Sequence, residues 1–154
     1  MVRISDSILI ARPVEVVFDT VADQRNEPRF NAAMTGCRKV TDGPIGVGTR
    51  FASTMASRGR PLEMVSEYTV FDRPHLLGSE TTSPMGRVVG TLRFRPEGTG
   101  TRMQWDWQLS LSGAARLLAP VMPLLGRRME RSIWTGLKTF LETDGITKPN
   151  SNAG

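Results

Sequence analysis

Polar and apolar residues alternate along residues 2–10 and through most of the stretch from 33 to 111. This period of two is typical of strands that bury one face and expose the other. The pattern predicts seven strands, at residues 2–10, 34–40, 48–56, 62–72, 76–82, 86–96 and 101–112. Turn sequences rich in glycine and proline separate the last six of these. Because such short loops join neighbouring antiparallel strands, we expect an antiparallel meander.

Two short helices are predicted between the first and second strands. Residues 11–23 read ARPVEVVFDTVAD, in which Pro13 suits a first helical turn and valines share one face with Phe18. Residues 24–32, QRNEPRFNA, predict a second short helix or a turn. The chain is therefore expected to begin with a strand and two short helices.

A long helix is predicted after the last strand, because apolar residues there recur at steps of three and four. Pro120 and Pro123 should break its first third, which leaves residues 124–143 as regular helix. Residues 144–154 are polar and turn-rich and predict a disordered tail. No repeat or linker divides the rest, so we expect one α+β domain over residues 1–143.

Composition and charge limit the compartments and binding partners that the protein is expected to have. The single cysteine, Cys37, excludes an internal disulfide, and no apolar run is long enough for a signal peptide or for a membrane span of about 20 residues. We therefore expect a cytoplasmic protein without stable membrane insertion. The net charge is +5, but the arginines are scattered, and only Arg127, Arg128 and Arg131 form a tight group. This spread indicates a solvated basic surface and no nucleic-acid partner.

Groups that could carry chemistry are few. His75 is the only histidine, and no metal-binding or phosphate-binding spacing is present, so we predict neither a metal nor a cofactor. In MQWDWQLSL, alternation puts Trp105 and Trp107 on one face of a strand and Asp106 on the other, solvated face.

In the strand at residues 62–72, alternation does not decide which side of the sheet the glutamates face. In LEMVSEYTVFD, Glu63 and Glu67 share a face with Val65 and Phe71 in a regular strand, so either side of the sheet is consistent with them. Tyr68 lies on the opposite face, among apolar side chains, where its hydroxyl could anchor a ligand.

The order and spacing of three pieces match those of a known family. The pieces are ILIARPVEVVFDTVADQRNEPRFNAAM, EYTVFDRPHLLGSETTSPMGRVVGTLRFRPEGTGTRMQWDW and LLGRRMERSIWTGLKTFLE. Together they resemble the START-like helix-grip superfamily, also called SRPBCC, and within it the polyketide cyclase/dehydrase-like branch. The resemblance implies a curved seven-stranded antiparallel sheet wrapped around the long C-terminal helix. It also implies a cavity between them that holds lipids, sterols, polyketides or other apolar molecules, and in which a minority of members catalyse cyclisation or dehydration.

The resemblance predicts that the protein binds a hydrophobic small molecule, lipid-like or polyketide-like, in this cavity. The residues expected to line or close it are Phe30, Phe51, Met55, Met64, Tyr68, Met103, Trp105, Trp107, Leu118, Met122 and Met129. Relatives often carry tryptophan where Phe30 stands. Each of these residues, taken alone, is also consistent with plain core packing.

Two other functions stay open. In the first, the protein is a polyketide cyclase or dehydratase, with Glu67, Tyr68 or His75 supplying the proton transfers. In the second, the apolar segment AARLLAPVMPLLG, residues 114–126, docks a partner, a membrane or a second copy of the chain in a homodimer. The residues alone do not decide whether any reaction is catalysed.

Overall fold

Seven antiparallel strands form one curved sheet in the computed structural model, which describes residues 1–57 and 59–147. The strands are β1 (Val2–Ile10), β2 (Met34–Lys39), β3 (Arg50–Met55), β4 (Leu62–Asp72), β5 (Leu76–Ser83), β6 (Gly86–Glu97) and β7 (Gly100–Leu111). Their order across the sheet is β1-β7-β6-β5-β4-β3-β2, which makes β1 and β2 the edges. The predicted meander is confirmed, and β1 joins it by pairing with β7.

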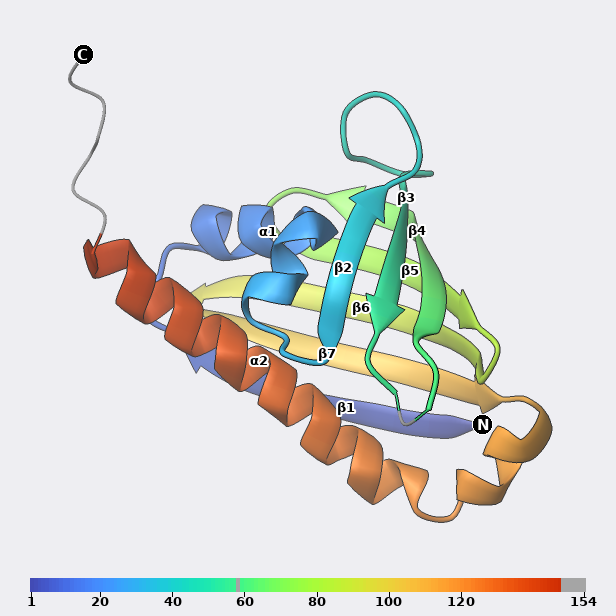
Figure 1. The fold of residues 1–154 in the computed structure, drawn as a ribbon. Helices are drawn as coiled ribbons and strands as arrows, with labels where there is room; N and C mark the ends of the chain where they lie inside the picture. Colours follow the sequence, from blue (N-terminus) through green and yellow to red (C-terminus); the bar gives the residue numbers. More distant parts are fainter. Residues whose placement is uncertain (58, 148–154) are drawn as a thin grey trace.

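The described residues also form two α-helices and two 3₁₀ helices. These are α1 (Val14–Ala22), η1 (Gln24–Arg29), η2 (Gly113–Leu118) and α2 (Met122–Thr147). The sheet curves around α2, which runs across one of its sides, while α1 and η1 lie between β1 and β2 in the chain (Figure 1). The predicted α+β helix-grip fold is confirmed.

The core is packed between the sheet and helices α1 and α2. Helix α1 begins directly after Pro13, and it buries one face made of Val14, Val17, Phe18, Val21 and Ala22. Phe18 meets the rings of Phe71 and Phe94 edge-on, with centroids 5.4 and 5.2 Å apart. Such edge-to-face pairs add to the free energy gained by burying the rings.

Helix α2 is fixed on the edge strand β1. Gly126 permits the close approach, because a Cβ atom there would collide with the side chain of Ile4. Three side chains of α2 also bond to the β1 edge and the residue after it: Arg131 donates to the Ser7 carbonyl and Lys138 to the Leu9 carbonyl, both at 2.8 Å, and Glu142 accepts from the Ala11 amide at 2.8 Å. The position of α2 over the sheet is therefore determined along several of its turns.

Two details differ from the sequence predictions. Helix α2 continues to Thr147, beyond residue 143, and the rest of the predicted tail, 148–154, lies outside the described residues. In β4 the pairing with β5 shifts between Tyr68 and Val70. This bulge brings Phe71 to the same side as Tyr68, where it packs in the core, rather than to the side of Glu67.

Candidate functional site

The inner face of the sheet, which faces α2, is covered unevenly. At one end its side chains are at most 3 % exposed, and these are Phe51, Tyr68, Leu77, Phe94, Met103 and Trp105. Further along the same or paired strands, six apolar side chains of the inner face are only partly buried, and these are Met55, Leu62, Met64, Val88, Trp107 and Leu109. We name the first set the closed end and the second the open end. An apolar molecule could add cover only at the open end.

The predicted lining residues on the strands divide between the two ends. Phe51, Tyr68, Met103 and Trp105 belong to the closed end, and Met55, Met64 and Trp107 to the open end. The closed-end residues form part of the continuous core cluster.

The predicted lining residues outside the strands are also spread. Phe30 is partly buried, and its ring lies 6.3 Å from those of Trp134 and Phe140 on α2. Met122 is buried, but Leu118 and Met129 are exposed by 38 % and 48 %. The covered face of α2 runs through positions 122, 126, 130, 134, 137 and 141, so Met129 falls beside it. The structure therefore does not bring Leu118 and Met129 to the sheet.

Glu130 places a carboxylate on this sheet-facing side of α2. Its Oε2 accepts hydrogen bonds from the indole N–H groups of Trp107, at 3.0 Å, and Trp134, at 2.8 Å. Burial raises the pKa of Glu130 above its ordinary value, and the two indole donors offset only part of that rise. The site thus holds a carboxyl group bonded by two tryptophans, one of which belongs to the open end.

Glu27, in η1, supplies a second carboxyl group near the first. Part of the residue is still accessible, but its carboxyl is surrounded by protein, and this burial raises its pKa from 4.5 to about 7. Asn31 opposes the rise by donating to Glu27 Oε1 at 3.5 Å, while the charge of Glu130 adds to it. At neutral pH, Glu27 can therefore either donate or accept a proton.

Other polar atoms of the interior differ in their bonding. The Tyr68 hydroxyl donates to the Ala22 carbonyl at 2.7 Å, and burial raises its pKa. The indole N–H of Trp105 is buried without an acceptor among the described residues, and its ring centroid is 6.1 Å from that of Trp134. Tyr68 is thus engaged within the protein, whereas Trp105 retains a free donor.

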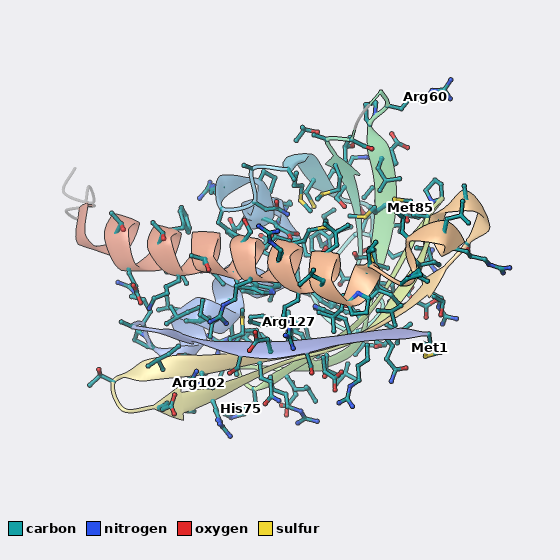
Figure 2. All side chains as sticks on the ribbon, turned by 90° about the horizontal axis from the view of Figure 1, so that it is seen from below. Met1, Arg60, His75, Met85, Arg102 and Arg127 are labelled. Carbon is teal, nitrogen blue, oxygen red and sulfur yellow. The ribbon has the colours of Figure 1, made fainter. Side chains whose placement is uncertain are left out.

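The predicted catalytic candidates do not converge. Glu67 lies on the outer face, where its Oε1 accepts from Arg50 Nε at 2.7 Å. His75 is exposed at the start of β5, on the side of the sheet away from α2 (Figure 2). Of the three, Tyr68 alone points inward. Asp106 lies on the outer face, as alternation predicts, and pairs with Arg3 at 2.8 Å.

Neither the cysteine nor the acidic residues form a metal centre in the described part of the chain. Within residues 1–57 and 59–147, no three His, Cys, Asp or Glu side chains gather around one point. Burial, together with the charges of Glu27 and Asp23, raises the pKa of Cys37 to about 11. Its thiol is therefore protonated and unreactive at neutral pH.

Two hollows of the described surface lie outside the sheet–helix interior. One is lined by His75, Arg93, Phe94, Arg95, Arg102 and Gln104, and the other by Arg3, Ile4, Ser5, Pro123, Leu124 and Arg127. The closed end is filled by its own side chains. A ligand under α2 would thus have to lie at the open end.

Glu27 and Glu130 were not among the sequence-predicted site residues. For Glu130 a signal exists, since it shares a helix face with Ile133, Trp134 and Leu137, at spacings of three, four and seven. A charged residue on such an apolar stripe is a candidate for a buried polar group. Glu27 lies in a 3₁₀ segment without periodicity, so its burial follows only from the tertiary packing.

Comparisons with known proteins agree with the fold. The sequence profile of the family described as polyketide cyclase / dehydrase and lipid transport matches residues 1–142. No curated protein sequence matches the chain. A solved structure, TTHA0849 from Thermus thermophilus, shares 19 % identity with a TM-score of 0.80, over 96 % of this chain and 100 % of that one.

Two further solved structures carry aromatase/cyclase names. The Zhui aromatase/cyclase from Streptomyces sp. R1128 shares 12 % identity, with a TM-score of 0.74, over 94 % of this chain and 98 % of that one. The di-domain ARO/CYC BexL, from the BE-7585A biosynthetic pathway, shares 19 % identity, with a TM-score of 0.75, over 97 % of this chain and 48 % of that one. At these identities the likeness shows the fold alone.

The profile match covers almost the whole chain, and the observed fold agrees with it. Within the described residues, no helix has the length and apolar character needed to cross a bilayer. The chain belongs to the polyketide cyclase/dehydrase and lipid transport family, in the helix-grip superfamily.

Proposed function

We propose that the protein binds a hydrophobic small molecule, lipid-like or polyketide-like, at the open end of the inner sheet face beneath α2. The observation that carries this proposal is the partial cover of Met55, Leu62, Met64, Val88, Trp107 and Leu109, which face α2 and yet are not fully buried. Covering apolar surface of this kind is the main source of affinity for an apolar ligand.

The two carboxyl groups add a polar requirement to the ligand. Glu130 shares its Oε2 with Trp107, an open-end residue, and Glu27 is close enough for the two charges to interact. A ligand hydroxyl or carbonyl placed beside them can exchange hydrogen bonds with a neutral or ionised carboxyl. The proposed ligand is therefore mostly apolar, with one polar group directed toward η1 and α2.

Tryptophan fluorescence tests the proposal directly, because the three tryptophans of the chain, Trp105, Trp107 and Trp134, all belong to this region. Oleic acid and the anthraquinone emodin represent the two ligand classes. We expect at least one of them to change the emission saturably and to be retained at one molecule per chain in native mass spectrometry. Absence of binding by either probe counts against the proposal.

A matched pair of variants locates the site. Met64 and Val65 are neighbours in β4, but Met64 faces α2 at the open end and Val65 is exposed on the outer face. Met64→Trp fills space at the open end and should lower affinity by about ten-fold or more, measured by calorimetry, whereas Val65→Trp should leave it unchanged. Equal effects of the two variants would place the ligand elsewhere.

A second function at the same site, acid–base catalysis of the cyclase or dehydratase type, is favoured by one observation. Glu27 has a pKa raised to about 7 beside another buried carboxyl, which suits a group that gives and takes protons at neutral pH. If the protein is an enzyme, Glu27→Gln should abolish turnover of a poly-β-ketone thioester and leave emodin binding intact. If wild-type protein binds emodin but produces no cyclised or dehydrated product, binding alone is the function.

A further inference from the structure

The passage from β7 into α2 carries a surface of large apolar side chains. Leu117, Leu118, Val121, Leu124, Leu125 and Met129 are exposed by 38 to 84 % of their surface. The 3₁₀ helix η2, which provides the first two, has no buried residue at all. We name these six residues, with Arg116, Arg127 and Arg128, the η2–α2 surface. Apolar side chains gathered in this way usually mark an interaction site.

The charge of this surface has one sign. From Trp107 to Met129 the sequence contains no aspartate or glutamate, while Arg116, Arg127 and Arg128 fall within it. None of these arginines forms an ion pair with another described residue. Arg127 and Arg128 follow Leu124 by three and four residues, so they stand beside it on the helix. Arg127 lies on the side of α2 toward β1, in the hollow that Pro123 and Leu124 also line (Figure 2).

These charges discriminate between occupants. If two copies of the chain met through this surface, the three arginines of one copy would face the three of the other. No carboxylate from residues 107–129 would be present to neutralise them. A bilayer containing anionic lipid offers both an apolar layer for the leucines and negative head groups for the arginines. We infer that the η2–α2 surface docks the protein on an anionic lipid bilayer.

Docking through this surface also suits the position of the open end. Helix η2 follows β7 directly, and the Ser112 amide bonds to the Met85 carbonyl at 2.9 Å, at the turn between β5 and β6. Leu109 and Val88, which pair with each other at the open end, are each three residues from Ser112 and Met85. The bilayer would therefore lie next to the end of the sheet at which we propose that a ligand binds, although docking itself does not require that proposal.

Flotation with vesicles tests the inference. We expect the wild-type protein to float with vesicles of phosphatidylcholine containing about 25 % phosphatidylglycerol at low salt, and not with phosphatidylcholine alone. Added salt should weaken the binding, because it screens the arginines. Leu117→Ser with Leu124→Ser should abolish flotation, and Arg127→Gln with Arg128→Gln should weaken it by roughly thirty-fold. These side chains are exposed, so the variants should fold normally, which their circular dichroism checks.

The matched control removes exposed apolar groups elsewhere. Val65 and Val89 are exposed by 42 % and 38 % on the outer face of the sheet, and Val65→Ser with Val89→Ser should leave flotation unchanged. Failure of the wild type to float, or equal loss in the control, overturns the inference. So does a homodimer in sedimentation that Leu124→Ser dissociates, since a second copy would then cover the surface. Emodin binding in solution, measured on the same variants, reports separately on the proposed function.

Discussion

The closed and open ends of the inner sheet face are made of similar side chains, aromatic rings and methionines, but they differ in what lies above them. Helix α1 covers the closed end, where Phe18 packs on Phe94 and Phe71. At the open end, Glu130 of α2 contacts Trp107, and both Trp107 and Met64 stay partly accessible. Cover by a second helix, rather than composition, therefore separates the core of this sheet from its candidate binding site.

Replacing one side chain by alanine at the closed end and one at the open end should give the largest difference in stability. Phe94 is 2 % exposed and touches Phe18, so Phe94→Ala should lower the free energy of unfolding by about 3 to 5 kcal/mol. Met64→Ala at the open end should cost less, about 1 kcal/mol, since Met64 is only partly buried and less of its surface is removed from water than that of Phe94. Urea denaturation measures both values. Similar losses at the two sites would mean that the open end is packed like core.

The next prediction concerns Glu27 and pH. An acid with a raised pKa in the folded protein keeps its proton while the unfolded chain has already lost it, so stability falls as pH rises from 4.5 to about 7. The rise in pKa corresponds to about 3 kcal/mol. Glu27→Gln should therefore match the wild type near pH 4 and exceed its stability at pH 8 by up to that amount.

Glu67→Gln is the control for this comparison, because Glu67 is a carboxylate on the outer face. Thermal unfolding of both variants over the same pH range isolates the effect of Glu27 from that of the other carboxylates. A constant difference between Glu27→Gln and the wild type at every pH would mean that Glu27 ionises normally.

A smaller loss of stability is expected when a side chain is added at Gly90, which lies beside Trp107 of the open end. A Cβ atom at Gly90 would collide with the Asp106 carbonyl and come within 2.8 Å of the Trp107 ring. Gly90→Ala should therefore cost about 1 to 3 kcal/mol and shift the tryptophan emission. Gly46→Ala, where nothing lies within 4 Å of the added atom, should change neither. An unchanged emission in Gly90→Ala would show that Trp107 does not depend on this contact.

The smallest effect should come from the outer face. Arg3 and Asp106 pair at 2.8 Å in a solvent-accessible position, and the hydrogen bond from Arg3 lowers the pKa of Asp106. Asp106→Asn should cost under about 1 kcal/mol, with the difference from wild type lost as pH falls toward the pKa of Asp106. A larger cost in urea denaturation would assign Asp106 a structural role that its exposure does not suggest.

The sequence predicts the sheet well because period two and turn residues are local signals. Alternation alone gives the facing of Asp106 and its flanking tryptophans. It fails at Phe71, because one extra residue in β4 reverses the facing of everything after it, and nothing local in that strand announces the bulge.

The candidate site is predicted less completely. Alternation and the family resemblance find Met64 and Trp107, but they do not separate these from closed-end residues such as Phe51, since that depends on which helix lies above. Glu27 acquires its properties from tertiary packing around a short 3₁₀ segment. The exposure of Met129 likewise depends on how α2 is rotated about its axis. Neighbouring residues on a helix point in directions about 100° apart, so Met129 is exposed although Glu130 faces the sheet.

The hydrogen bonds between α2 and β1 also protect the protein from aggregation through its edge strand. An edge strand offers unpaired carbonyl and amide groups to any other extended chain, which is a common route to aggregation. Here the side chains of Arg131, Lys138 and Glu142 occupy the groups of Ser7, Leu9 and Ala11 that face away from β7. A chain truncated before these residues would lose these hydrogen bonds as well as most of α2, and we expect it to self-associate through β1.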